Sequence, residues 1–304
     1  MNVSSISVII PVYQCAERLS EHVESLRLLR PLVHEFIWVI TESPDRSHEI
    51  AREAAKEIGG QILEVARGLY QAWNSGIARA TREFIYISTI GDTITPDGLN
   101  ALALCIKKNQ ADMVFSPPVI WPRTKTNLKK SCHWPVFRFA ETLRLFAGAK
   151  IPKESAMIMQ LLSGASGLLG SCASCLFRTS FLQKQPFPTD HYHYGDTAWT
   201  FRHLHESVLC YYQQPVARFV IHDDSIQRTV SKSQIFTLTH QLASHLPPSL
   251  AQVRDSYIHS SIALDKLRNP HQKFGWWWIP AAWRARVIRN NSEKTLIKKI
   301  QQFH

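Results

Sequence analysis

The sequence lacks the marks of a secreted or disulfide-stabilised protein. Its six cysteines have no disulfide-type spacing, and Met1–Ser5 contains no basic segment of the kind that opens a signal peptide. Both absences favour a reducing, cytoplasmic compartment. The motif Cys172–Cys175 has no second cysteine pair, so two buried thiols are favoured there over zinc or redox chemistry. No internal repeat occurs, and 45% apolar with 19% charged residues are typical of a globular chain.

Acidic residues are also scarce. The chain has 24 Asp and Glu against 35 Lys and Arg, which gives a net charge of +11. This excess favours an anionic partner such as nucleotide phosphates, an acidic polymer or an anionic membrane surface, although it can also serve solubility alone. No basic-aromatic platform or nucleic-acid-binding helix motif accompanies the charge, so nucleic acid is not an expected partner.

Charge is missing altogether from one long segment, residues 155–177. Its length would allow a helix to cross a bilayer. However, it contains several glycines and serines, with Gln160 near the middle. The segment is therefore either buried structure, which we expect, or a membrane-inserted helix.

Strands and helices alternate over the first hundred residues. Residues 6–12 form a continuous apolar run, as in a strand buried on both faces. Apolar spacing predicts strands over 6–12, 36–40, 61–65, 84–88 and 112–115, with helices over 16–29, 48–58, 71–80 and 96–107. This alternation predicts a parallel sheet with right-handed crossovers.

The chain beyond His222 reads as helical, with amphipathic helices expected over 235–246 and 250–267. We therefore expect a first domain over residues 1–225 and a helical, basic, Trp-rich extension over 226–304. Within the extension, residues 273–289 mix Trp with Arg. This mixture suits the headgroup region of a membrane, and a core plug or a dimer contact is the equal alternative.

Three segments share the motifs of one enzyme family. Residues 5–13 read SISVIIPVY, residues 69–77 read LYQAWNSGI, and the segment 89–97 reads TIGDTITPD. Together they resemble family-two glycosyltransferases of the GT-A fold, in the branch with an NSGD-like loop in place of the DxD motif. The resemblance is firm from residue 5 to about residue 100, and weaker to His222.

The resemblance implies an α/β fold of the GT-A type, with a Rossmann-like, mostly parallel sheet flanked by helices and a C-terminal helical extension. It implies inverting transfer of a sugar, of the hexosyltransferase type, in polysaccharide biosynthesis. The expected donor is a UDP- or GDP-linked nucleotide-sugar, and the expected acceptor is a saccharide or lipid-linked saccharide. The expected location is cytoplasmic, with peripheral contact at the inner face of the plasma membrane.

The family motifs also imply a donor site. It would comprise Pro11, Val12, Tyr13, Thr41, Glu42, Asp45, Arg67, Asn74 and Gly91. Thr41 stands where the family has the acid that reads the base, with Glu42 beside it. Tyr13 would stack on the base or cover the sheet edge, and Arg67 would bind phosphate through its forked donors. Asn74 matches a near-fixed family residue, although its amide could instead satisfy backbone groups nearby.

The expected metal ligand is Asp92. The three DxD positions fall on Thr89, Ile90 and Gly91, so the family acids are missing and Asp92 matches the acid just after them. Its oxygens would suit Mg²⁺ or Mn²⁺ acting on the diphosphate, or they could accept backbone N–H bonds in a turn. The missing acids also support an alternative function, a catalytically inactive partner subunit that binds a nucleotide-sugar or glycan.

The expected catalytic residue is Asp196. The segment Tyr194–Thr197 resembles the family motif YGED, in which an acid takes the proton of the acceptor hydroxyl, and Thr197 replaces its second acid. Asp196 could alternatively cap the helix that follows.

Overall fold

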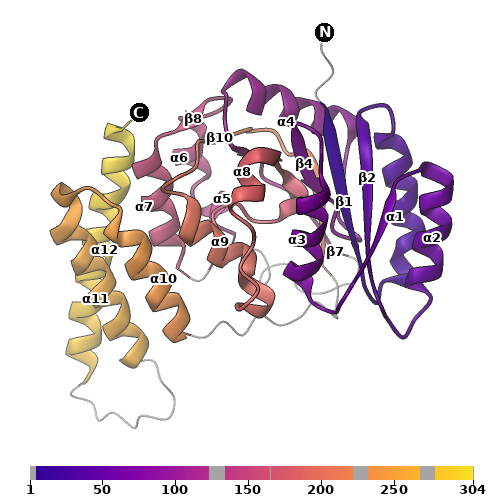
Figure 1. Cartoon of the computed structure of the whole chain (residues 1–304). Coiled ribbons are helices and arrows are strands. Elements are labelled where there is room, and N and C mark those ends of the chain that lie inside the picture. The colour runs from indigo at the N-terminus through magenta and orange to yellow at the C-terminus, as the bar shows by residue number, and fades with distance from the viewer. Residues whose placement is uncertain (1–4, 123–133, 165, 222–231, 268–277, 304) are drawn as a thin grey trace.

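The computed structural model describes residues 5–122, 134–164, 166–221, 232–267 and 278–303 (Figure 1). The strands are β1 (Ile6–Val12), β2 (Val33–Thr41), β3 (Gln61–Val65), β4 (Phe84–Ile87), β5 (Thr93–Ile94), β6 (Met113–Phe115), β7 (Val119–Pro122), β8 (Lys150–Ile151), β9 (Cys175–Arg178), β10 (Leu209–Tyr211) and β11 (Ala217–Ile221). The helices are α1 (Ala16–Leu29), α2 (Ser47–Ile58), α3 (Leu69–Arg79), α4 (Pro96–Lys108), α5 (Pro135–Arg138), α6 (Ala140–Arg144), α7 (Lys153–Ser163), α8 (Thr179–Lys184), α9 (Gly195–His203), α10 (Lys232–Ser244), α11 (Ala251–Leu267) and α12 (Trp278–Gln302). Short 3₁₀ turns lie at Cys172–Ser174, Tyr192–Tyr194 and Pro248–Leu250.

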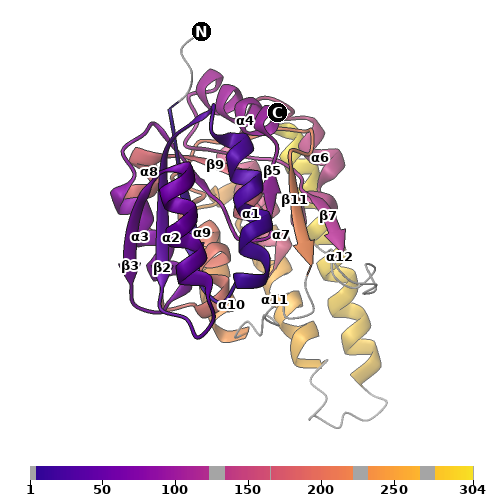
Figure 2. The same cartoon turned by 90° about the vertical axis from the view of Figure 1, so that its right-hand side faces the viewer.

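The central sheet has eight strands in the order β3-β2-β1-β4-β9-β6-β10-β8. Its first half is parallel, because β1 pairs with β2 and β4, and β2 pairs with β3, all in the same direction. This half confirms the predicted βαβ crossovers. A smaller sheet, β5-β11-β7, lies next to α1 (Figure 2).

The second half of the sheet is mixed, which the strand–helix alternation did not predict. β9 lies antiparallel between β4 and β6, and β8 lies antiparallel to β10. β9 comes from the uncharged segment 155–177, so that segment supplies the middle of the sheet. The apolar side chains of β9 are covered on both faces, which explains why this part of the sequence carries no charge.

Helices cover both faces of the sheet. Successive residues of a strand point to opposite faces, so Ile9 joins one hydrophobic cluster while Val8 and Ile10 join the other. α1, α2 and α4 cover the second cluster, and Figure 2 shows α1 and α2 side by side over this face. α3, α7, α8 and α9 cover the first. Both faces of β1 are therefore buried, as its continuous apolar run predicts.

The uncharged segment is buried over residues 155–162 and 171–177, and the described residues between them are buried or partly buried. Helix α7 buries residues from Ser155 to Leu162, and the side-chain amide of Gln160 bonds the carbonyl of Ser166 and the N–H of Leu168. Among the described residues, no helix is long and apolar enough to cross a bilayer. The expectation of buried structure thus holds for the described part of the segment.

The C-terminal helices pack onto the rest of the chain. α10 contacts α7 and α9, α12 contacts α7, and Leu242, Tyr257 and Leu296 belong to the same hydrophobic cluster as α3 and α9. Figure 1 places these helices at the end of the molecule opposite α1 and α2. The division at residue 225 remains a prediction. Of the Trp- and Arg-rich segment, residues 273–277 and the side chains of 278–282 lie outside the described residues.

Candidate active site

The predicted site residues lie at or just after the ends of β1, β2 and β4, in or just before α3, and in the first turn of α9. The carboxyl ends of parallel strands meet at one edge of an α/β sheet, which is where such sheets bind ligands. β1 ends at Val12, β2 at Thr41 and β4 at Ile87. The loops after them carry Tyr13, Glu42 and Asp92, so the fold brings the donor-side and metal-side predictions to the same edge.

Tyr13 and Arg67 form one contact at this edge. The guanidinium of Arg67 lies over the Tyr13 ring at 5.0 Å from its centroid, although the two residues follow different strands. Arg67 is exposed and Tyr13 is partly exposed. A ring and a forked cation, side by side and open to solvent, can stack on a base and bind a phosphate. At the end of β2, Thr41 is buried, whereas the next residue, Glu42, is exposed.

Asp45 ties two loops of the site together. Its carboxylate accepts hydrogen bonds from the N–H of Ala16 at 3.0 Å, the N–H of Ser47 at 3.2 Å and the hydroxyl of Ser43 at 2.7 Å. Burial raises the pKa of Asp45, but these bonds and the Ser47 side chain outweigh it and hold the pKa far below its usual value. The carboxylate therefore stays charged and fixes the β2–α2 loop to the start of α1. Pro11 and Val12 lie in β1, and Val12 is buried.

Asp92 is buried and anchored by its side chain. One carboxylate oxygen accepts the N–H of Val220 in β11 at 2.9 Å, and the other accepts the hydroxyl of Ser171 at 3.4 Å. Asp92 therefore accepts a backbone N–H bond, which is one of the two roles expected from the sequence. These two bonds join the Asp92 loop to β11 and to the turn at Ser171.

The loop before Asp92 is held by a buried histidine that the sequence analysis did not identify. The N–H of Gly91 donates to Nδ1 of His22 at 3.4 Å, so Nε2 is assigned the proton and donates to the Ser88 hydroxyl at 2.8 Å. Burial lowers the pKa of His22 to about 4, which keeps the ring neutral. Gly91 has a φ of 101°, a conformation that favours glycine.

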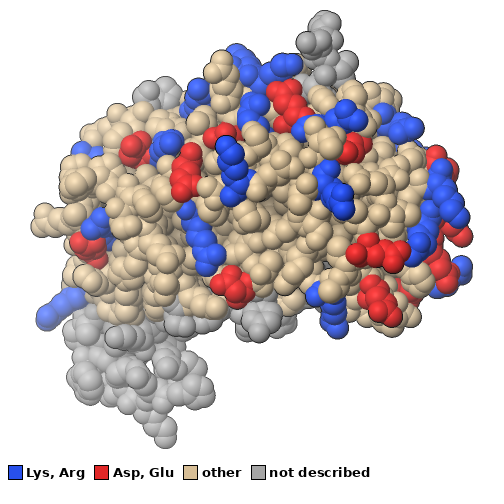
Figure 3. Space-filling view, viewed as in Figure 1, with Lys and Arg blue, Asp and Glu red and all other residues tan. Residues whose placement is uncertain are grey.

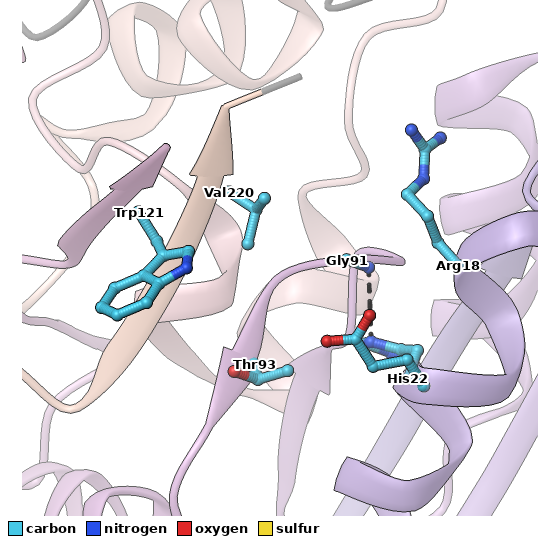
Figure 4. Close-up of a pocket in the computed structure, with 7 residues that line it drawn as sticks. Arg18, His22, Gly91, Thr93, Trp121 and Val220 are labelled. Carbon is cyan, nitrogen blue, oxygen red and sulfur yellow. Dashed lines mark hydrogen bonds between the residues drawn. The ribbon is translucent and has the colours of Figure 1, made fainter. Parts of the chain in front are cut away.

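A small cavity of about 100 Å³ opens beside this loop. Figure 4 shows Gly91 between His22 and Arg18 from α1 on one side and Val220 and Trp121 from the small sheet on the other. The cavity therefore lies where α1, the Asp92 loop and the second sheet meet.

Asp196 lies in the first turn of α9 with one oxygen fixed. Its Oδ1 accepts the N–H of Thr197 at 2.7 Å and lies 3.1 Å from the hydroxyl of Tyr70. Burial, followed by the charge of Asp196, raises the pKa of Tyr70, so the phenol stays protonated and can donate. No hydrogen bond to Oδ2 is formed among the described residues. This oxygen can accept a proton from a ligand.

A close backbone approach explains the glycine before Asp196. A methyl group on Gly195 would lie 2.6 Å from two ring carbons of Tyr70 and from the carbonyl oxygen of Pro188. Helix α9 can therefore pack against Tyr70 only with glycine at this position. Tyr70 has no distinct signal of its own in the sequence beyond its place in the segment 69–77.

The Asn74 side chain makes a two-bond contact with a distant loop. Its Nδ2 donates to the carbonyl of Phe187 at 2.7 Å, and its Oδ1 accepts the N–H of Phe187 at 2.9 Å. Phe187 in turn contacts the rings of Tyr70, Trp73 and Trp199. Asn74 therefore anchors the segment that leads to Asp196, and a role in donor binding remains a prediction.

The described residues contain no group of three or more His, Cys, Asp or Glu side chains placed to hold a metal ion. Mg²⁺ is commonly held by one or two carboxylates together with substrate phosphates. A single carboxylate at Asp92 fits that arrangement, and it does not fit an all-protein metal cage.

Comparison with known families decides the class of this protein. The family model described as glycosyl transferase family 2 matches residues 7–160, just over half of the chain. The chain belongs to glycosyl transferase family 2. The matched segment of this glycosyltransferase includes the predicted donor and metal residues, whereas Asp196 lies beyond it.

Solved structures show the same fold for this glycosyltransferase. S. aureus TarS 1–349 in complex with UDP-GlcNAc has a TM-score of 0.59 at 13% identity, covering 99% of this chain and 92% of that chain. TarS 1–349 in complex with UDP has a TM-score of 0.51 at 12% identity, with the same coverage. No curated protein matches the sequence. The predicted GT-A fold is thereby confirmed.

Proposed function

We propose that this glycosyltransferase moves a sugar from a nucleotide-sugar to a saccharide or lipid-linked saccharide acceptor with inversion at the anomeric carbon. The proposal rests on the hydrogen bonding of the Asp196 carboxylate. Two donors orient its Oδ1, and its Oδ2 has no hydrogen bond among the described residues. A carboxylate held in this way can take the proton of an acceptor hydroxyl as the new bond forms. One base and a single attack would invert the anomeric centre.

The donor would lie over Tyr13 and Arg67. The aromatic ring offers a stacking surface for a base, and the adjacent guanidinium offers two parallel donors to a phosphate. The UDP-GlcNAc and UDP complexes of TarS support a uridine nucleotide, with a guanosine nucleotide as the alternative. Thr41, Glu42 and Gly91 complete the proposed donor site, whereas the Asp45 carboxylate shapes it by fixing the β2–α2 loop.

A divalent cation, Mg²⁺ or Mn²⁺, would be held by Asp92 and the donor diphosphate. When bound, such an ion stabilises the departing diphosphate as a Lewis acid. Asp92 keeps its position through β11 and Ser171, and His22 keeps the preceding loop in place through Gly91. Arg67 supplies positive charge at the same edge of the sheet.

The first experiment is a thermal-shift screen with UDP, GDP, CDP and dTDP, each with Mn²⁺ and with EDTA. A ligand that binds the folded state raises the melting temperature. We expect a shift with one nucleotide, larger with Mn²⁺. Equal shifts with Mn²⁺ and EDTA would contradict the metal, and no shift with any nucleotide would contradict the donor site.

Asp196→Asn separates an active enzyme from an inactive partner subunit. The amide keeps the shape of the side chain but is a poor base, so we expect nucleotide binding to persist while transfer falls by at least a hundredfold. Equal transfer by the variant and the native protein would remove Asp196 from catalysis. The anomeric configuration of the product, measured by NMR, tests inversion.

We also propose a peripheral membrane contact on α12. Trp283, Val287 and Ile288 are 64%, 36% and 49% exposed, and Arg284 and Arg286 are exposed beside them. An exposed indole flanked by cations suits an anionic headgroup layer. On the face drawn in Figure 3, Lys and Arg are interspersed with Asp and Glu. Trp283→Ser should reduce sedimentation with anionic vesicles, whereas Leu28→Ser, at a residue 65% exposed on α1, should not.

The cytoplasmic location remains part of the proposal. All five described cysteines are free and buried, which agrees with a reducing compartment.

A further inference from the structure

A cavity of about 420 Å³ lies between α5, α7, α10, α11 and α12, away from the strand ends that form the donor site. Pockets that bind small molecules usually have volumes of about 300–1,000 Å³. The cavity is partly open to solvent, so a ligand can enter it.

Most of the cavity wall is apolar. Leu161 and Leu162 line it from α7, Ile235 from α10, and Ile258 and Leu264 from α11, and all five are buried. These side chains belong to three helices that pack around the same space. The wall can therefore surround a hydrocarbon chain, which gains from leaving water.

Polar side chains also line the cavity. Arg289 lines it from α12, and no carboxylate pairs with Arg289 among the described residues. The Arg289 guanidinium lies over the Tyr257 ring at 5.8 Å from its centroid. Arg138, also at the cavity, pairs with Glu293 and with the carbonyl of Leu162. Arg289 is thus the cation whose bonding an anionic ligand would complete.

The cavity and the pocket beside Asp196 are lined by residues that are close in sequence. Gly164 lines the cavity with a φ of +62°, and a methyl group there would meet no atom within 4 Å. Leu169 and Gly170 line the small pocket together with Asp196.

We propose that this cavity binds an anionic amphiphile, a prenyl or acyl chain carrying a phosphate or diphosphate. Its chain lies against the apolar wall, and its anionic end meets the Arg289 guanidinium. Such a ligand is the lipid part of an acceptor, an assignment that rests on the proposed glycosyltransferase function. Binding of the chain itself does not depend on that function.

The test is calorimetric titration of the full chain with octyl phosphate below its micelle concentration, with octanol and inorganic phosphate as partial probes. We expect octyl phosphate to bind more tightly than octanol, and phosphate alone to give no measurable heat. Arg289→Gln should weaken octyl phosphate binding about tenfold, because it removes a charge-assisted contact. Ser261→Leu, which fills part of the cavity, should weaken both alkyl probes.

The matched control is Arg286→Gln, three residues earlier on the exposed face of α12. Equal losses in the two arginine variants would mean that octyl phosphate binds the basic surface, and unchanged binding in Ser261→Leu would also overturn the proposal. Each variant is tested with UDP by thermal shift, which reports folding and the donor site. Octyl phosphate binding by a protein that responds to none of the four nucleotides would refute the proposed function and leave the cavity assignment standing. UDP binding without octyl phosphate binding would overturn the cavity assignment and leave the proposed function standing.

Discussion

Asn74 offers the sharpest test of how this site is built. Its two hydrogen bonds to the backbone of Phe187, at 2.7 and 2.9 Å, join α3 to a segment more than a hundred residues away. Asn74→Ala removes both bonds and leaves a buried N–H and C=O unpaired. Each unpaired group costs about 1–3 kcal/mol, so we expect a loss of about 2–6 kcal/mol in the free energy of unfolding. A domain near the middle of the ordinary range, about 5–15 kcal/mol, would remain folded.

Asn74→Asp gives the same test a pH dependence. The substitution keeps the oxygen that accepts the Phe187 N–H, but it replaces the nitrogen that donates to the Phe187 carbonyl with a second oxygen. Only the protonated acid can donate there, so the folded state raises the pKa of the new carboxyl above its unfolded value of about 4. The stabilising bond is then present below about pH 4 and is lost as the pH rises through the folded pKa. The free energy of unfolding of Asn74→Asp should therefore be close to that of the native protein near pH 4 and well below it at pH 7.

The assay is urea unfolding followed by Trp fluorescence at both pH values, with Ser75→Ala as the control. Ser75 is the next residue on α3, and its hydroxyl donates only within the helix, to the carbonyl of Gln71. The UDP affinity of Asn74→Ala should stay within about threefold of the native value, since no ligand contact is removed. Native stability combined with lost UDP binding would refute the anchoring role and favour Asn74 as a donor ligand.

Three further substitutions test neighbouring contacts. Tyr70→Phe should lower kcat about tenfold with little change in KM, because it removes one of the two donors that orient Asp196, and an equal kcat would contradict that role. The native protein should lose about 3 kcal/mol of stability as the pH falls from 6.5 to 4, because the unfolded state binds a proton at His22 that the buried ring, with its pKa of about 4, does not bind. His22→Gln should abolish this pH dependence. Asp45→Asn should be most destabilising at neutral pH, since the lowered pKa of Asp45 stabilises the fold above its unfolded pKa and this contribution is lost as the pH falls. Denaturation at a series of pH values checks the last two.

The parts of the fold that sequence could predict are those set by local pattern. The strand over 6–12 is where its largely apolar run placed it, because burial on both faces favours apolar residues, and the polar exception, Ser7, donates to Glu35. β9 was not predicted as a strand. It has four residues, Cys175–Arg178, and its two partners lie about 60 and 90 residues earlier, so no local periodicity marks it.

The candidate site divides in the same way. Asp92 and Asp196 could be named from motifs, because each lies in a short segment that resembles the family. Their supporting partners could not, since His22 lies far in sequence from Gly91, and Tyr70 far from Asp196. A buried histidine on an amphipathic helix carries no sign of which loop it will meet. Only the packing of α1 and α3 against the sheet supplies those pairings.

Helix α3 joins the two halves of the proposed reaction. Arg67, which contacts Tyr13 on the donor side, immediately precedes the helix. Tyr70 and Asn74 lie four residues apart and therefore on one face, where Tyr70 contacts Asp196 and Asn74 holds Phe187. Gly76 allows the same helix to pack closely on the sheet, because a methyl group there would lie 2.5 Å from a side-chain carbon of Ile9. The segment 69–77 is therefore best interpreted as a rigid bridge that sets the distance between the donor and the base, so a shift of α3 should affect donor binding and proton removal together.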